Sequence, residues 1–436
     1  MTGRLRRWQD ALSRSAFFAN TLALISGTAV TQAIVFLASP ILSRVFGLED
    51  FGNLANYNAW VSVLALLSNF RYEHAIIVAR GRKHVSRVVA LTMLLSLGSF
   101  VLYSALALGL VVGYRGNGYL AHLKDIALLI PVGTLAVCIS SVFIQLNVKT
   151  GQFRRLATIG AVQVVCTLTA QLVLGRQHVT HALILGTIVG FVASALALAW
   201  YFVREGGVVE VRSGLRPAHL RATARAHLNF PRYTLAADAI TVVAQQFIPV
   251  FVLALFNPAV AGLYAFSIRV VRVPLIVVST AVAGALRKEA IDRVHGGQSL
   301  RPLFAMTTKT LTLLSLMPFV VVLLFAQPIF AVVFGQQWAE AGRVVQILSP
   351  GILLEFIGLP LAVFFLVTDT QRYTLAIQAA GFLLLVSALA VGKWYFDDFI
   401  STCYLVSAAM LGVNLVSIVL AGRVSANRDA PAAVPI

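Results

Sequence analysis

The chain has 436 residues, of which 59% are hydrophobic and 11% are charged, and its mean hydropathy is +0.87. Soluble domains carry about 25% charged residues, so this composition excludes a soluble globular protein and indicates a polytopic membrane protein. Lys and Arg number 34 against 16 Asp and Glu. In a membrane protein this excess first reflects the positive-inside rule, rather than nucleic-acid binding.

The cysteines and the N-terminal segment show no pattern of metal binding or cleavage. Cys138, Cys166 and Cys403 are spread through apolar segments without CxxC or Cys/His spacing, which indicates small buried side chains. We therefore expect no metal, no other cofactor and no disulfide framework. The N-terminus has a basic lead but no small-residue cleavage pattern, so its apolar run is predicted to remain as the first span.

Apolar runs bounded by charged or turn residues predict twelve transmembrane helices. In chain order they cover about residues 21–43, 52–79, 88–112, 125–147, 156–174, 181–203, 233–256, 262–287, 303–325, 343–367, 373–394 and 400–421. After the ninth helix, the stretch QPIFAVVFG is predicted to be re-entrant or a frayed helix end.

Two polar segments are predicted to lie outside the bilayer. The longer covers residues 204–232, and its second part has the composition of a short amphipathic helix on the membrane surface. The tail, residues 423–436, is polar and rich in Ala and Pro, and it is predicted to be disordered.

Basic residues are distributed unequally between the two sides of the predicted spans. Most lie in the N-terminal segment, in the loops after even-numbered helices and in the tail. The opposite side carries only Arg44, Arg115, Lys124, Arg176, Arg343 and Lys393. Because basic residues concentrate on the cytoplasmic side, both termini are predicted to be cytoplasmic, with an even number of spans.

A weak internal repeat relates the two halves of the chain. RVFGLEDFGNLAN at residues 44–56 aligns without gaps with ALFNPAVAGLYAF at residues 254–266, an offset of 210 that pairs Gly52 with Gly262. With six predicted spans in each half, and six being even, the repeats are predicted to be parallel, about an axis along the membrane normal.

This repeat predicts a domain organisation. The N-terminal lobe would cover residues 1–203, the cytoplasmic linker residues 204–232 and the C-terminal lobe residues 233–422. The first two helices of each lobe carry much of the intramembrane polarity, and we expect them to line one central cavity.

Two arginines lie inside the eighth predicted helix. Arg269 and Arg272 start roughly 10 and 15 Å from the helix entrance, and their spacing places them on one face. A charge at the centre of a lipid-facing helix costs about 2.5–3.5 kcal/mol on insertion scales. That face is therefore predicted to look into the cavity and to bind an anion. The alternative is snorkelling or a structural ion pair.

Acidic residues inside helices have two interpretations. Glu355, near mid-membrane in the tenth helix, could bind a proton or Na⁺ for coupling. A structural pair with an arginine of the eighth helix is favoured, because an unpaired buried acid is costly. Asp238 is open to both interpretations. Arg71 and Glu73, near the end of the second helix, indicate either an interfacial anchor or part of the cavity lining.

No sequence pattern supports covalent chemistry. The chain lacks GxxxxGK[ST], HExxH and a Ser-centred elbow, so neither ATP hydrolysis nor hydrolytic chemistry has support. A polysaccharide polymerase or ligase would need a sizeable outside loop. The longest outside loop, near residues 113–124, has only about a dozen residues.

A family resemblance is carried by helices 1, 2, 7 and 8. The segments GTAVTQAIVFLASPILSRVFGLEDFG and NFRYEHAIIVAR resemble the N-terminal signature of oligosaccharide and lipopolysaccharide flippases, the Wzx-type branch of the MOP exporter superfamily. NFPRY before the seventh helix and G-x-Y-x-x-x-x-R at residues 262–269 resemble the start of that family's second half. The resemblance covers most of the chain.

The resemblance implies an all-α, V-shaped exporter of about twelve helices. It would move an undecaprenyl-diphosphate-linked oligosaccharide from the inner to the outer leaflet of the bacterial inner membrane, for lipopolysaccharide O-antigen, capsule or exopolysaccharide. Arginine suits a diphosphate because its planar fork donates bidentately, and amide side chains would bind sugar. The implied substrate-binding set is Arg269, Arg272, Arg71, Gln32, Asn58 and Gln245.

The resemblance also implies what the protein works with. We expect a transporter and not an enzyme, with the lipid bilayer and a lipid-linked glycan as partners and no nucleic acid. Coupling to H⁺ or Na⁺, and contact with polysaccharide polymerase machinery, are left open. The main alternative is a multidrug antiporter of the same superfamily, whose cationic substrates two arginines disfavour. A lipid II flippase is a further alternative, but members of that family generally have about fourteen helices, two more than are predicted for this chain.

Overall fold

The computed structural model describes residues 30–207 and 215–426, and these residues form helices and connecting turns without any strand. Nine of the described helices are long and apolar enough to cross a bilayer, or eleven if two bent pairs each count as one span. A shorter apolar helix, Val30–Val45, begins at the first described residue. The all-α polytopic fold is therefore confirmed. The start of the first predicted span, residues 208–214 of the linker and residues 427–436 of the tail lie outside the described residues.

The described helices group into two units. Among the described residues, the first contains residues 30–38 and those between 60 and 239, and the second contains residues 39–59 and 240–426. The segment Ser39–Ala59 therefore groups with helices from the second half of the chain. The predicted lobe boundaries at residues 203 and 233 remain a prediction.

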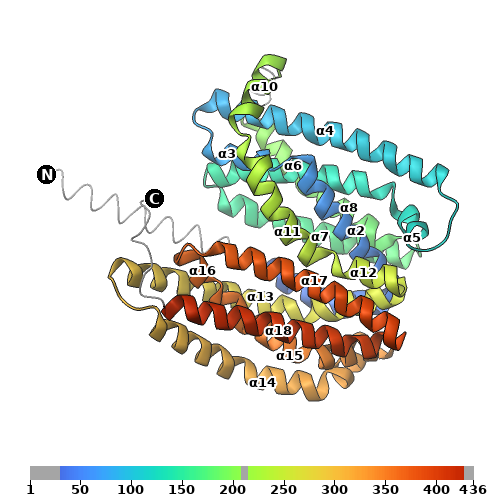
Figure 1. Cartoon of the computed structure of the whole chain (residues 1–436). Helices are drawn as coiled ribbons and strands as arrows, with labels where there is room; N and C mark the ends of the chain where they lie inside the picture. The colour runs from blue at the N-terminus through green and yellow to red at the C-terminus, as the bar shows by residue number, and fades with distance from the viewer. Residues whose placement is uncertain (1–29, 208–214, 427–436) are drawn as a thin grey trace. The chain divides into compact units, whose positions relative to one another are not determined.

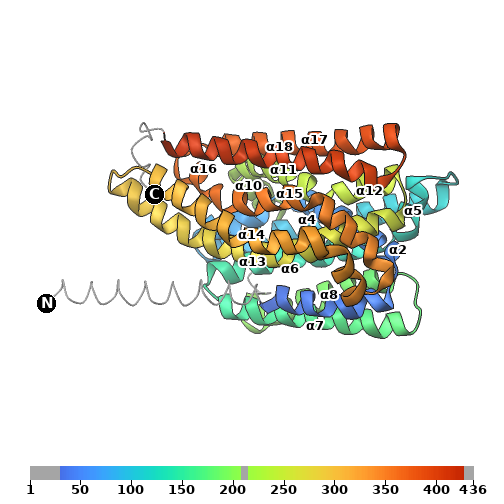
Figure 2. The same cartoon turned by 90° about the horizontal axis from the view of Figure 1, so that it is seen from below.

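The first unit contains four long apolar helices. They are α4 (Arg82–Gly113), α6 (Leu129–Lys149), α7 (Phe153–Arg176) and α8 (Ala182–Arg204). Figures 1 and 2 show α7 and α8 side by side along their lengths. Glycine makes this close packing possible, because a Cβ at Gly190 would lie 1.8 Å from the hydroxyl oxygen of Thr167. A short helix, α5 (Tyr119–Ile126), precedes α6.

The second predicted helix, over residues 52–79, is not continuous. Helix α2 (Leu48–Ser68) is followed by a 3₁₀ turn, Tyr72–His74, and by α3 (Ala75–Val78), with a bend of 62°. Phe70 and Arg71 have φ of 47° and 59°. Non-glycine residues adopt this left-handed conformation only locally, so the chain cannot continue as one helix through them.

The amphipathic helix expected in the linker is α10 (Pro217–Ala226), which packs against α4. The hydroxyl group of Tyr72 donates to the carbonyl oxygen of Ala224 at 3.2 Å. Just beyond α10, the Nε2 atoms of His227 and His84 lie 2.9 Å apart. Burial lowers the pKa of His227 below its ordinary value, and electrostatic repulsion from the neighbouring His84 is a second, smaller cause.

The second unit is a bundle of long and short helices around a buried core. Its elements are α12 (Ile248–Leu255), α13 (Pro258–His295), α14 (Arg301–Phe334), α15 (Ala339–Leu361), α16 (Val363–Val367), α17 (Gln371–Phe396) and α18 (Phe399–Ala426). Figures 1 and 2 both show α17 beside α18. Trp338, which is fully buried, joins the bundle to the segment Ser39–Ala59, because its indole N–H donates to the carbonyl oxygen of Ser43 at 2.9 Å.

Several predicted helix ends were wrong. Helix α14 is continuous to Phe334, so QPIFAVVFG is neither re-entrant nor frayed. Helix α13 continues through RKEAIDRVH to His295, and α18 extends to Ala426, into the segment predicted as a disordered tail. The seventh predicted helix, residues 233–256, is bent by 49° between α11 (Leu235–Gln246) and α12.

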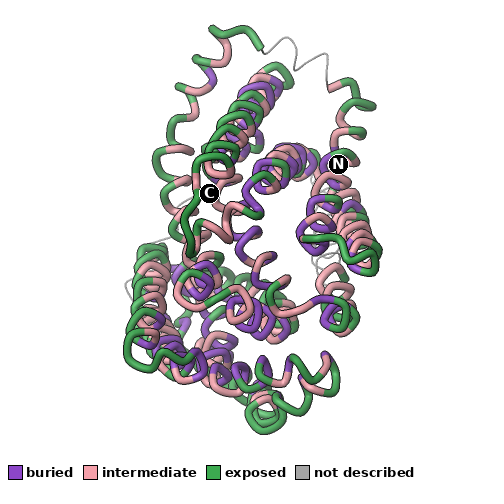
Figure 3. The backbone as a smooth tube through the Cα atoms, turned by 90° about the vertical axis from the view of Figure 1, so that its right-hand side faces the viewer, coloured by how far each residue is buried: buried purple, intermediate pink, exposed green. Residues whose placement is uncertain are grey.

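Burial follows the faces on which helices meet. Figure 3 shows buried residues in runs along these faces and exposed residues on the outer ones. On the outer face of α14, Leu313, Met317 and Val332 are 62%, 77% and 77% exposed. Contiguous apolar exposure of this kind marks a surface that faces something other than water. On a helix of this length and hydropathy, that environment is lipid.

Candidate functional site

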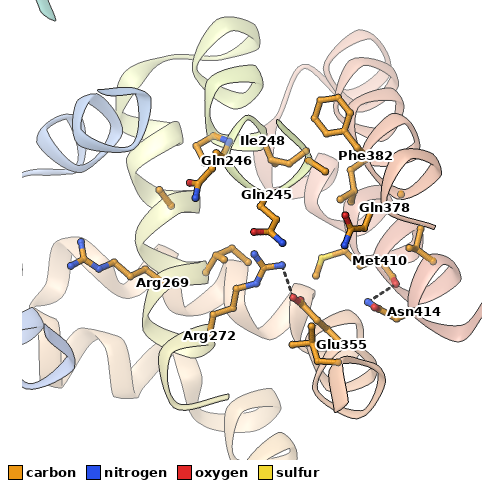
Figure 4. A pocket seen from close by; sticks show the side chains of 18 of the residues that line it. Gln245, Gln246, Ile248, Arg269, Arg272, Glu355, Gln378, Phe382, Met410 and Asn414 are labelled. Carbon is orange, nitrogen blue, oxygen red and sulfur yellow. Dashed lines mark hydrogen bonds and ion pairs between the residues drawn. The ribbon is translucent and has the colours of Figure 1, made fainter. Parts of the chain in front are cut away.

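A pocket of about 430 Å³ lies within the second unit, a volume in the usual range for ligand sites. Its walls come from the first part of α2, the end of α11, and from α12, α13, α15, α16, α17 and α18. Residues far apart in the sequence therefore meet around one space. Figure 4 shows the side chains of some of the residues that line it.

Helix α13 supplies both arginines of the pocket. Its start is fixed by Asn257, whose side chain accepts a hydrogen bond from the N–H of Val260 at 2.9 Å, and by Pro258 in the first turn. Counted from this start, Arg269 and Arg272 lie about 16 and 21 Å along the helix. Both line the pocket, deeper than the roughly 10 and 15 Å expected from a helix beginning at Gly262.

Arg272 forms an ion pair with Glu355 on α15. Its Nη2 atom lies 2.7 Å from Oε1 of Glu355 (Figure 4). The pair leaves two buried polar atoms, Nε of Arg272 and Oε2 of Glu355, without a hydrogen-bond partner among the described residues. A buried polar atom without a partner loses its hydration without compensation, so the pair is incompletely satisfied. Glu355 is thus paired with an arginine of α13, and its role, structural or in coupling, stays a prediction.

Arg269 differs from Arg272 although both line the same pocket. Within the described part of the chain, Arg269 forms no ion pair. Figure 4 shows its side chain directed away from Glu355. Counting described residues alone, the pocket therefore has one guanidinium group that is neutralised and one that is not, and we expect its potential to favour an anion.

Amide side chains form much of the remaining polar lining. Gln245 and Gln246 come from the end of α11 and Asn58 from α2. Gln378 on α17 accepts a hydrogen bond from the hydroxyl group of Thr241 at 2.8 Å, and Asn414 on α18 donates to the carbonyl oxygen of Met410 at 2.9 Å. Amides that donate and accept are suited to hydroxyl-rich ligands.

Sequence reasoning missed Gln378 as a pocket residue, and it gave Gln246 and Asn414 no role. The signal was available, because each is an amide within an apolar helix, as Gln245 is. Their convergence could not be read from the sequence, because α11, α17 and α18 meet only in the folded unit.

Arg71, Glu73 and Asp238 do not line this pocket and instead lie together in the first unit. Nε of Arg71 lies 2.7 Å from Oδ2 of Asp238, and Nη1 lies 3.3 Å from Oε1 of Glu73. One guanidinium group thus serves two carboxylates, and Glu73 is only 3% exposed. The cluster forms at the left-handed break after α2. Gln32, in the helix Val30–Val45, lines neither site.

The described residues contain no group of three or more His, Cys, Asp and Glu side chains that could hold a metal ion. The titratable residues in the pocket lining are Tyr264, Arg269, Arg272 and Glu355. This set can bind an anion and hydrogen-bond a polar ligand, and it offers one carboxylate that could accept a proton.

Comparison with known families gives one match over most of the chain. A family model described as "Polysaccharide biosynthesis protein" matches residues 41–343. A comparison with curated proteins gave no match.

Solved structures of MOP superfamily transporters are similar in fold. An inward-facing multidrug resistance MATE transporter has 14% identity and a TM-score of 0.69, with 91% of this chain and 98% of that chain covered. A MOP superfamily transporter from Pyrococcus furiosus, reported to have a binding pocket of reverse polarity, has 14% identity and a TM-score of 0.57, covering 93% and 95%. The lipid II flippase MurJ, in an inward closed conformation, has 10% identity and a TM-score of 0.63, covering 94% and 87%. At these identities the likeness shows the MOP fold alone.

Proposed function

Because the chain belongs to the polysaccharide biosynthesis protein family, we propose that it is a flippase for a polyprenyl-diphosphate-linked oligosaccharide. It translocates this substrate across the bacterial inner membrane by alternating access, for O-antigen, capsule or exopolysaccharide. The protein is not an enzyme in this proposal, because translocation forms and breaks no bond.

The observation that carries the proposal is the pair of arginines in one pocket. Arg269 and Arg272 bring two guanidinium groups into the interior of a bundle of apolar helices, where an uncompensated charge is costly. Only one has a carboxylate partner among the described residues. A diphosphate supplies the missing negative charge, with oxygens spaced for bidentate hydrogen bonds.

The rest of the pocket suits the remaining parts of such a substrate. Asn58 and Gln245, together with Gln246, Gln378 and Asn414, offer hydrogen bonds to sugar hydroxyl groups. The lipid chain has no need of a polar site and stays in the bilayer. Gln32 and Arg71 are proposed to contact substrate only at other stages of transport, since neither lines this pocket.

Membrane orientation and coupling to an ion gradient complete the proposed mechanism. Both termini are cytoplasmic in it, on the grounds of the basic-residue distribution. Glu73 and Asp238 share Arg71, which makes this cluster a candidate for coupling to H⁺ or Na⁺, together with Glu355. Polysaccharide polymerase machinery would receive the product.

A multidrug antiporter is the alternative function. A cationic drug would require an uncompensated carboxylate in the pocket. Glu355 is the one carboxylate among the described lining residues, and it is already paired with Arg272. Among the residues that the structure describes, the charge without a carboxylate partner belongs to Arg269, which repels a cation.

A charge-removal experiment tests the proposal. We expect Arg269→Gln to lower surface polysaccharide about tenfold or more, because a hydrogen bond to a charged group contributes about 1.5–3 kcal/mol. The matched control is Arg287→Gln, on an exposed part of the same helix and outside the pocket, which should leave polysaccharide unchanged. Amounts of protein in the membrane are measured in parallel. Normal polysaccharide in a strain carrying both Arg269→Gln and Arg272→Gln would refute the site.

A further inference from the structure

We propose that Glu355 competes with the anionic substrate for Arg272, so that binding of a diphosphate is coupled to uptake of one proton by Glu355. This inference rests on the proposed function, and it assigns the two pocket arginines different roles. Arg269 has no carboxylate partner among the described residues, whereas Arg272 becomes available to an anion only when Glu355 releases it.

The first argument is the incomplete satisfaction of the ion pair. Only Nη2 of Arg272 and Oε1 of Glu355 contact each other, at 2.7 Å. Nε of Arg272 remains a buried donor without an acceptor, and Oε2 of Glu355 remains a buried acceptor without a donor. A phosphate oxygen supplies the acceptor that Arg272 lacks, and a proton on Oε2 gives Glu355 a donor of its own.

The second argument is the position of Glu355 beside Arg272. It lies on α15 near Ile352 and Phe356, each 4% exposed, so this part of the helix packs in the bundle core. Because Oε1 of Glu355 is 2.7 Å from Nη2 of Arg272, a diphosphate bound to Arg272 would lie close to Glu355. Two anionic groups at one site disfavour each other's charged form, and the carboxylate relieves this repulsion by accepting a proton from water.

The third argument is the absence of another group that could take this role. The other titratable residues that line the pocket are Tyr264, Arg269 and Arg272, all from α13. Among the described lining residues, α2, α11, α12, α16, α17 and α18 contribute amide, hydroxyl and apolar side chains and no acid. In the part of the chain that the structure describes, Glu355 is thus the one lining carboxylate whose protonation can compensate an incoming anion.

Calorimetry on the full-length protein in lipid nanodiscs tests this inference, with geranylgeranyl diphosphate as the probe. Titrations at pH 7.5 in two buffers of different ionisation enthalpy give the number of protons taken up per ligand bound. We expect about one proton for the wild-type protein, and an affinity that falls by about tenfold for each pH unit above that value. The ligand's own ionisation, with a pKa near 6, is largely complete in this range.

The variant Glu355→Gln keeps the side-chain shape and removes the titration. We expect it to take up no proton and to bind the probe with an affinity that does not change between pH 7.5 and 8.5. The control Glu289→Gln removes an exposed acid that pairs with Arg293 on the same helix as Arg272, and it should behave as the wild type. Thermal unfolding of each variant verifies that it is folded.

The outcomes separate this inference from the proposed function. Binding of the probe to the wild type without proton uptake would overturn the competition, and it would leave the diphosphate site intact. Proton uptake that persists in Glu355→Gln would also overturn it. No binding of the probe by the wild type at any pH would overturn the diphosphate site, and the competition with it. The first and last of these need no variant, so misfolding cannot obscure them.

Discussion

Gly52 on α2 and Gly262 on α13 pack against each other through a reciprocal backbone contact. A Cβ added to Gly52 would lie 2.0 Å from the carbonyl oxygen of Pro258, and one added to Gly262 would lie 1.8 Å from that of Leu48. The two glycines are separated by 210 residues, and so are Leu48 and Pro258, the first residues of the two helices. The repeat seen in the sequence therefore appears in the second unit as a local two-fold contact.

This contact predicts the effect of adding a methyl group. We expect Gly262→Ala to destabilise the protein by about 1–3 kcal/mol or more, because the obstruction is backbone and cannot rotate away. Gly52→Ala should have a similar effect, since the contact is reciprocal. Thermal unfolding in detergent measures the change.

The control for that prediction is Gly284→Ala, on the same helix. A Cβ there has nothing within 4 Å, and alanine in a helix interior is favoured over glycine by about 0.5–1 kcal/mol. The variant should be as stable as the wild type or slightly more stable. Equal destabilisation by Gly262→Ala and Gly284→Ala would contradict the close contact.

The ion pair between Arg71 and Glu73 predicts that a second substitution restores stability lost by the first. Arg71→Gln leaves Glu73, which is only 3% exposed, as a buried charge without its cation, and we expect a loss of about 3–5 kcal/mol. Adding Glu73→Gln removes that charge and should recover much of the loss. If the double variant unfolds at the same temperature as Arg71→Gln alone, the ion pair does not account for the effect.

Because Trp338 is fully buried, we expect its substitution to destabilise the protein more than substitution of an exposed tryptophan. Trp338→Phe removes the indole N–H that donates to Ser43, and it leaves a void in a fully buried site. The expected cost is about 1–3 kcal/mol from the hydrogen bond and the lost packing. Trp394→Phe, at a position that is 89% exposed, should change the unfolding temperature little. A large effect at Trp394 alone would argue against this assignment of the core.

His227 predicts a pH dependence at the junction of α10 and α4. Its pKa is lowered by burial, so the folded state favours neutral imidazole. The stabilisation is full above the unfolded pKa of about 6.5 and is lost as the pH falls below that value toward the lowered folded pKa. We expect hydrogen exchange in α10 to accelerate, relative to α8, on acidification from pH 7.5 to 5.5. His227→Gln should reduce this acceleration, and an equal acceleration in that variant would exclude His227 as the cause.

Much of the fold followed from the sequence because apolar runs of membrane-spanning length carry a strong signal. The helical fold and the placement of most spans needed only hydropathy and turn residues. The ends of α13 and α18 were placed too early because a helix can continue into polar sequence, as RKEAIDRVH does. The break at Phe70 and Arg71 was missed because it depends on a left-handed backbone conformation. Phe and Arg rarely adopt this conformation, so their presence does not predict it.

The sequence by itself determined that Arg269 and Arg272 need a partner or a polar surround, because charge within an apolar helix is costly in lipid. Only the tertiary structure decided that Glu355 pairs with Arg272 and leaves Arg269 without a carboxylate among the described residues. It also separated Arg71, Glu73 and Asp238 from the pocket. The reason is physical: the cost of a buried charge is a property of the residue, whereas its compensation depends on which other helices pack beside it.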